Sequence, residues 1–176
     1  MPHEPDTRTL SSRRADERET LGSMLDYYRG TVVWKCSGMS EEDLRKVIVP
    51  SGWSMLGMVN HLAYVEQNWF QILFAGEPRE NFPVPWTDED PDADFRIGPD
   101  QSTESILDFY RDACAKSVAI TASASLDALT AEWPADRPPE RQPTLRWIML
   151  HMIEETARHA GHMDVVRELI DGATGD

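Results

Sequence analysis

Hydrophobic residues return at three- and four-residue steps along most of the chain, which is the spacing of one buried face of an α-helix. Four long segments carry this pattern: residues 16–38, 54–75, 102–125 and 144–171. A shorter segment, 40–47, opens with a serine followed by acidic residues and predicts an N-capped short helix or turn. No alternation of apolar and polar residues typical of strands interrupts them. The pattern therefore predicts an all-α fold, a four-helix bundle with long loop connections.

Two proline-rich segments connect the predicted helices. Residues 77–101 are also rich in acidic residues, and residues 135–143 form a shorter polar connection. Irregular connections as long as the first are usually covering loops with a function rather than spacers. Its aromatic residues predict that it packs on the bundle: Phe82, Trp86 and Phe95.

Length and composition describe one globular domain. The chain has 176 residues, of which 40% are hydrophobic and 27% charged. Residues 1–14 lack an apolar period and predict a flexible N-terminal arm, which leaves residues 15–176 as a single bundle domain. No apolar run is long enough for a membrane span or a secretory signal. Cys36 and Cys114 are typical of reduced thiols, so we expect a cytoplasmic protein with no membrane partner.

The chain is strongly acidic, with 17 basic and 31 acidic residues and a formal net charge of −14. This balance repels phosphate backbones, and no basic stripe is present to overcome it. We therefore expect no nucleic-acid partner. Helical bundles often pair, which suggests a homodimer that nothing in the sequence itself establishes.

The fourth predicted helix places metal-competent side chains on the face that should be buried. With His151 as zero and about 100° per residue, Glu155 lies near about 40°, His159 near about 80° and His162 near about 20°. Apolar residues share this arc: Ile148, Val166 and Leu169. Ionisable groups among apolar ones cost free energy unless a partner compensates them. These inward-facing histidines and the glutamate therefore need polar or metal partners inside the fold.

The second predicted helix repeats the anomaly, because His61 shares a face with apolar residues: Met58, Val65, Trp69 and Ile72. A lone buried histidine is more often bonded to a carbonyl oxygen than to a metal. Inward-facing histidine and glutamate side chains from two helices, however, are how bundles build metal sites. Glu155 and a histidine four residues away can chelate one ion, and spacing alone does not choose between His151 and His159.

Two motifs resemble those of the DinB-like superfamily of four-helix bundle proteins. The first is VNHLA at residues 59–63, followed by Val65 and Glu66, and the second is ETARHAGH at residues 155–162. The resemblance covers nearly the whole chain after the arm and is strongest to the actinobacterial branch. Many members carry histidine where this chain has Glu155. The resulting His-Glu-His set is similar to the zinc site of mycothiol-dependent maleylpyruvate isomerase, a relative within the superfamily.

The resemblance implies a divalent metal ion, often zinc or nickel, held by His61, Glu155 and His159 with an open coordination position. It leaves His151 outside the site and gives His162 an outer or pocket-lining role. Two tryptophans are further candidates for the pocket mouth: Trp53 and Trp86.

The resemblance also implies a function, a metal-dependent transferase that joins a low-molecular-weight thiol such as mycothiol or bacillithiol to a small-molecule electrophile. The isomerase relative has an additional C-terminal domain, so isomerase activity itself is not expected. Two alternatives stay open. One is a non-catalytic, stress-related metal-binding bundle with His151 or His162 as a fourth ligand. The other is a metal-free interaction protein whose buried histidines pair with Glu155.

Overall fold

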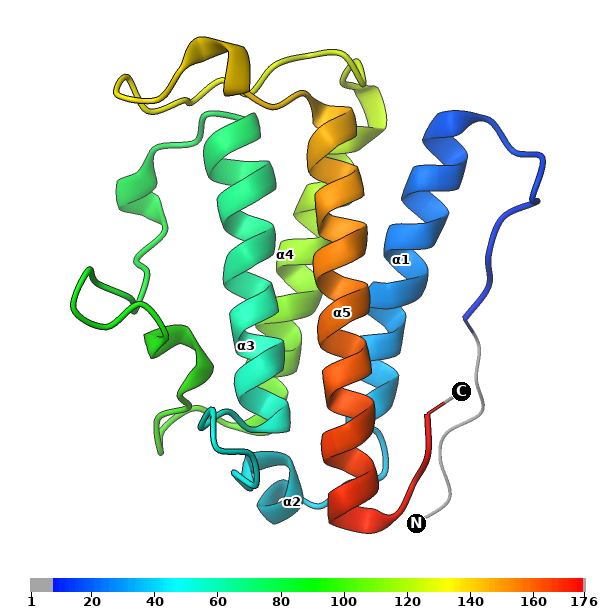
Figure 1. Cartoon of the computed structure of the whole chain (residues 1–176), viewed down its shortest axis with the longest axis vertical. Helices are drawn as coiled ribbons and strands as arrows, with labels where there is room; N and C mark the ends of the chain where they lie inside the picture. Colours follow the sequence, from blue (N-terminus) through cyan, green and yellow to red (C-terminus); the bar gives the residue numbers. More distant parts are fainter. Residues whose placement is uncertain (1–7, 176) are drawn as a thin grey trace.

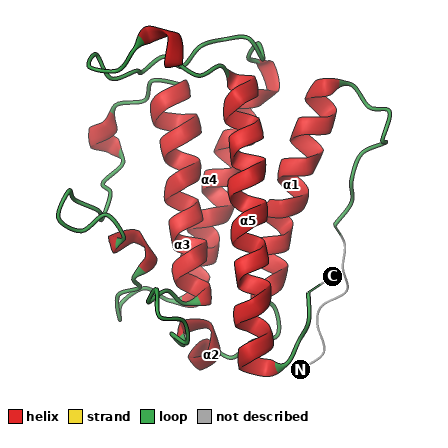
Figure 2. Cartoon of the chain, in the orientation of Figure 1, coloured by secondary structure: helices red, strands yellow, loops and turns green. Residues whose placement is uncertain are grey.

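The computed structural model describes residues 8–175 and shows a bundle of four long helices with no strand in that range (Figures 1 and 2). The predicted all-α four-helix bundle is therefore confirmed. A short helix, α2, joins the first two long helices, and a π-helical segment, η1, continues α3. The helices are α1 (Glu17–Cys36), α2 (Glu41–Arg45), α3 (Met55–Glu66), η1 (Gln67–Phe74), α4 (Thr103–Ser123) and α5 (Leu145–Asp171).

Polar N-caps explain where the five α-helices begin. In each case a side-chain oxygen accepts a hydrogen bond from the backbone N–H three residues later, which satisfies one of the amides that have no partner inside the helix. The C-terminal end of α5 uses a different device, since Gly172 adopts a left-handed conformation with φ of 78°. The capping residues are Asp16, Ser40, Ser54, Ser102 and Thr144.

The four long helices form two closely packed pairs. α1 packs chiefly on α5, and α3 packs chiefly on α4. One hydrophobic cluster fills the end of the bundle nearest α2, and a second fills the opposite end. Members of the first include Met55, Leu62, Ile106 and Met163. Members of the second include Leu25, Phe70, Leu145 and Met152. The pairs meet along two seams, one between α3 and α5 and the other between α1 and α4.

The second half of the predicted helix 54–75 is not α-helical. From Gln67 to Phe74 the chain is a π-helix, and the Ala75 N–H donates to the Phe70 carbonyl five residues back. π-Helical turns are rare and often lie at functional sites. The apolar spacing of this segment fits either helix type, so the pattern did not distinguish them.

Two apolar residues whose helical spacing matches the buried face of their helices, Val118 of α4 and Leu169 of α5, are exposed. Val118 is 44% exposed and Leu169 is 68% exposed. In α4 the inward position belongs to Ser117, whose hydroxyl donates to the Ala113 carbonyl. Near the end of α5 it belongs to Arg167, whose guanidinium donates to the Lys35 carbonyl. Because their polar groups are hydrogen-bonded to backbone carbonyls, Ser117 and Arg167 can be buried while the neighbouring apolar residues face solvent.

The described part of the predicted N-terminal arm lies against α1. The guanidinium of Arg8 lies 4.9 Å from the ring centroid of Tyr27 and 4.4 Å from that of Trp34, and it donates to the Thr31 hydroxyl at 2.6 Å. The rest of the predicted arm, residues 1–7, lies outside the described residues. Within residues 8–175, none of the helices combines the length and apolar character needed to cross a bilayer.

Candidate metal centre

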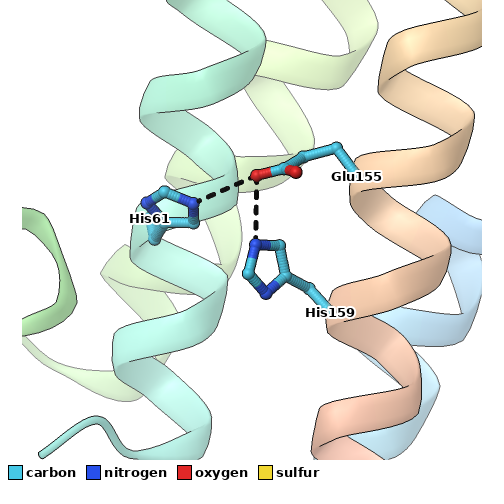
Figure 3. A group of neighbouring side chains, drawn as sticks. All are labelled: His61, Glu155 and His159. Carbon is cyan, nitrogen blue, oxygen red and sulfur yellow. Dashed lines mark hydrogen bonds and ion pairs between the residues drawn. The ribbon is translucent and has the colours of Figure 1, made fainter. Parts of the chain in front are cut away.

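Three side chains from two helices meet at the seam between α3 and α5 (Figure 3). Glu155 Oε1 lies 3.0 Å from His159 Nε2 and 3.6 Å from His61 Nε2. One donor atom from each residue lies within 4.8 Å of the other two. Glu155 and His159 stand one turn apart on α5, so both face α3, where His61 faces back. The structure thus brings together the three residues that the resemblance selected.

Burial and mutual hydrogen bonding set the charges of this group. The three side chains are 15%, 12% and 11% exposed for His61, Glu155 and His159. The hydrogen bond from His159 and then the nearby His61 ring hold the pKa of Glu155 well below its usual value. Burial alone would lower the pKa of His61, but its hydrogen bond to Asp94 and its contact with the Glu155 carboxylate together raise it. The group therefore presents a carboxylate between two imidazoles.

A fourth residue, Asp94, orients His61 and was not among the sequence-based candidates. Its Oδ2 lies 2.7 Å from His61 Nδ1. In the neutral ring this contact makes Nδ1 the protonated nitrogen, so the lone pair of Nε2 is available to a cation. A carboxylate behind a histidine ligand is a common arrangement in metal sites, where it fixes the ring and increases its basicity. Asp94 is one of several acids in a proline-rich loop, and no spacing signal singles it out.

The loop that carries Asp94 is fastened to α3. Asn60 donates from Nδ2 to the Asp94 carbonyl at 2.7 Å, and the ring of Phe95 stacks on that of His61 with centroids 4.0 Å apart and planes 16° apart. Gly57 makes the approach feasible, because a Cβ there would lie 2.1 Å from the Phe95 carbonyl oxygen. As predicted, the loop packs on the bundle. It also closes one side of the site.

The other two histidines of α5 do not join the three-residue group. His151 stacks on Trp147, with ring centroids 5.2 Å apart, and meets the edge of Trp69 at 4.8 Å. His162 is exposed, and its ring centroid lies 5.5 Å from that of His159. Among the described residues, the group that could hold a metal ion contains neither of them.

A cavity of about 210 Å³ lies beside His61. Of the two tryptophans proposed for a pocket mouth, Trp86 lines this cavity, whereas Trp53 packs against the hydrophobic cluster near α2. A larger cavity of about 600 Å³ lies in the opposite seam, between α1 and α4, and none of its lining residues belongs to the three-residue group. The smaller cavity is the one that shares a residue with the candidate centre.

The chemistry of the donor set fits a divalent cation. Two imidazoles and one carboxylate are the protein ligands of many catalytic zinc sites, where the remaining position stays open. The described residues offer three donors and no fourth, which matches an open site. Nδ1 of His159 is buried without a hydrogen-bond partner, so the described protein atoms leave one nitrogen of the three-residue group unsatisfied. A cation beside Glu155 would balance its carboxylate in this half-buried position.

Comparisons with known proteins agree with this fold. A family model described as mycothiol S-transferase matches residues 20–172. A solved structure, described as a crystal structure of the conserved protein of a locus from Enterococcus faecalis, has a TM-score of 0.69 at 15% identity. The alignment covers 90% of this chain and 99% of that chain, and it shows a shared fold. No curated protein matches the chain.

The family match runs from the first turn of α1 to the end of α5 and therefore includes both helices of the candidate centre. The DinB-like resemblance read from the two histidine-containing motifs is confirmed by it. The chain belongs to the mycothiol S-transferase family of DinB-like four-helix bundle proteins.

Proposed function

We propose that this protein is a metal-dependent thiol S-transferase that uses mycothiol and holds one divalent ion, zinc or nickel, on His61, Glu155 and His159. The observation that carries the proposal is the convergence of these three side chains beside a cavity. The match to the mycothiol S-transferase family supports the thiol. A cytoplasmic location and a single domain over residues 15–176 are part of the same proposal.

A divalent ion at this centre would lower the pKa of a bound thiol, so that the thiol is deprotonated at neutral pH. The protein residues supply position and charge. Asp94 accepts a hydrogen bond from Nδ1–H of His61, so Nε2 would be the nitrogen that binds the ion. Glu155 supplies negative charge at the centre, and Phe95 covers one face of the His61 ring.

In the proposed reaction a carbon–sulfur bond forms between the thiol sulfur and the electrophile. The bond to the leaving group breaks, and the leaving group departs with its electron pair. The thiol proton passes to solvent. No oxidant or reductant is required, because the reaction is a substitution.

The test compares isosteric glutamate variants on the same helix. Purified protein without an affinity tag is loaded with zinc or nickel and supplied with mycothiol and 1-chloro-2,4-dinitrobenzene. We expect Glu155→Gln to lose bound metal, measured by elemental analysis, and to fall to the uncatalysed rate. Glu168→Gln changes an exposed side chain and should retain both properties.

Equal rates for the Glu155→Gln variant and the unchanged protein would remove the catalytic claim. Stoichiometric metal with no turnover of any thiol would instead favour a metal-binding protein without catalysis. Faster turnover with bacillithiol than with mycothiol would retain the transferase chemistry and reassign the thiol.

A further inference from the structure

We infer that the cavity beside His61 binds a small, flat, aromatic electrophile that is neutral or cationic, and that it discriminates against anionic electrophiles. This inference rests on the proposed function and names its substrate class. The cavity is bounded by α3, η1 and the loop 77–101, and His61 forms one of its walls. A molecule in the cavity therefore lies next to the candidate metal centre.

Apolar side chains, two of them tryptophans, form much of the cavity wall. Trp69 and Trp86 are joined there by Val65 and Pro91. Neighbouring rings support both tryptophans. Trp86 meets Tyr64 at a centroid distance of 5.6 Å with planes 89° apart, and Trp69 lies 4.8 Å from His151. Supported aromatic walls favour a planar ring, because offset stacking and edge contacts add to simple burial.

The polar groups of the cavity exclude negative charge. None of the described lining residues is lysine or arginine. Asp94 is only 4% exposed, and its Oδ1 has no hydrogen-bond partner. The negative charge of this carboxylate, which borders the cavity, would repel a bound carboxylate or phosphate, since like charges at close range are strongly unfavourable. Asn68 adds one neutral amide to the wall.

The size of the cavity limits what it can hold. At about 210 Å³ it is smaller than the range of roughly 300–1,000 Å³ that is usual for drug-sized ligands. It accommodates one ring with small substituents. A thiol cofactor with a sugar framework must therefore lie largely outside it, so that the two reactants approach the centre from different sides.

The test uses two electrophiles that differ by one carboxylate, 2-chloro-1,3-dinitrobenzene and 4-chloro-3,5-dinitrobenzoate. In both, the thiol sulfur attacks the ring carbon that carries chlorine, the carbon–chlorine bond breaks and chloride leaves, while the thiol proton goes to solvent. After correction for the uncatalysed rates, we expect kcat/KM of metal-loaded protein to favour the neutral compound by about tenfold or more.

Tryptophan variants locate the effect. Trp86→Ala should lower kcat/KM for the neutral electrophile by about tenfold, with unchanged metal content and thermal unfolding. Trp133→Ala is the matched control, because Trp133 lies just before the other proline-rich connection, outside the cavity wall, and donates to the Pro138 carbonyl. Asn68→Lys places a cation in the cavity wall and should raise kcat/KM for the carboxylated electrophile by about tenfold.

Binding without reaction separates this inference from the proposed function. 1,3-Dinitrobenzene and 3,5-dinitrobenzoate have no leaving group, and their binding to metal-loaded protein can be measured by ligand-observed NMR. Selective binding of the neutral compound, lost in Trp86→Ala, supports the cavity even if no thiol is transferred. Equal binding of both compounds, or binding unaffected by Trp86→Ala, overturns the inference while leaving the transferase activity intact.

Discussion

At the scale of single residues, Asp94 shows how much of the site depends on a side chain that is not itself a proposed ligand. It holds the Nδ1 side of His61 at 2.7 Å from within the loop 77–101. Loss of such an outer partner typically lowers metal affinity by about ten- to a hundredfold, because the ligand ring becomes less basic and less fixed. We expect that loss for Asp94→Asn, measured by competition with a zinc chelator. Asp92→Asn, an exposed acid of the same loop, should change nothing.

The two cysteines give a second prediction at this scale. Burial raises the pKa of Cys36 to about 12 and also raises that of Cys114. The thiolate is the reactive form, so both thiols should resist iodoacetamide at pH 8 and react rapidly once the chain is unfolded in urea. Because the folded state binds these protons more tightly, its stability should fall as the pH rises from about 9 toward about 12. Rapid labelling of the folded protein would contradict this.

Some residues of the centre can be recognised from helical spacing in the sequence, and others cannot. Histidines and a glutamate on apolar helix faces stand out, which is why spacing made His61 and Glu155 candidates before the family pattern selected them. The choice of His159 over His151 required the family pattern, since both lie four residues from Glu155. His151 instead stacks on Trp147, and this is a long-range packing outcome that helix geometry alone does not contain.

At the scale of elements, the docking of the loop 77–101 on α3 depends on one glycine. A Cβ at Gly57 would lie 2.1 Å from the Phe95 carbonyl oxygen, which is backbone and cannot move without moving the loop. We expect Gly57→Ala to displace the turn Ala93–Phe95 and with it Asp94, even though alanine favours a helix more than glycine does. Metal affinity should fall, and hydrogen exchange should rise in residues 91–97.

Gly161→Ala serves as the matched control for that variant. Gly161 also lies within a long helix, but a Cβ added there meets nothing within 4 Å. Its replacement should leave metal affinity unchanged. A Gly57→Ala variant that binds metal as the unchanged protein does would show that the loop does not support the centre.

The elements themselves were the part of the fold most open to prediction. Capping residues and apolar periods placed the four long helices within about two residues of their observed ends. The π-helical conformation of Gln67–Phe74 was missed, because it depends on how that segment packs and not on its apolar spacing. The loop 77–101 was predicted to cover the bundle, but its register on α3 depends on contacts between residues far apart in sequence.

At the scale of the whole molecule, a buried ion pair links α1 to α3. Arg29 donates from Nε and Nη2 to the two carboxylate oxygens of Glu66 at 2.8 and 2.7 Å, and the side chains are 8% and 1% exposed. Removing one partner leaves an uncompensated buried charge, which typically costs about 3–5 kcal/mol. We expect Glu66→Gln to lower the free energy of unfolding by this order, measured in urea.

The double variant Arg29→Met and Glu66→Gln should recover much of that loss, because the unpaired guanidinium is then absent. Asp26→Asn is the control. Asp26 also contacts Arg29, but its side chain is 56% exposed, so its contribution should be small. Additive losses in the double variant would show that the pair is not the source of the effect.

The proposed ligands stand on different helix pairs, since His61 belongs to the pair α3–α4 and the other two belong to the pair α1–α5. A cation held by all three would link the helix pair α3–α4 to the helix pair α1–α5. No short peptide cut from the chain would retain the ion, and any opening of the seam between α3 and α5 would release it. Release of metal into a colorimetric chelator would then be a direct gauge of how far the two helix pairs have separated during unfolding.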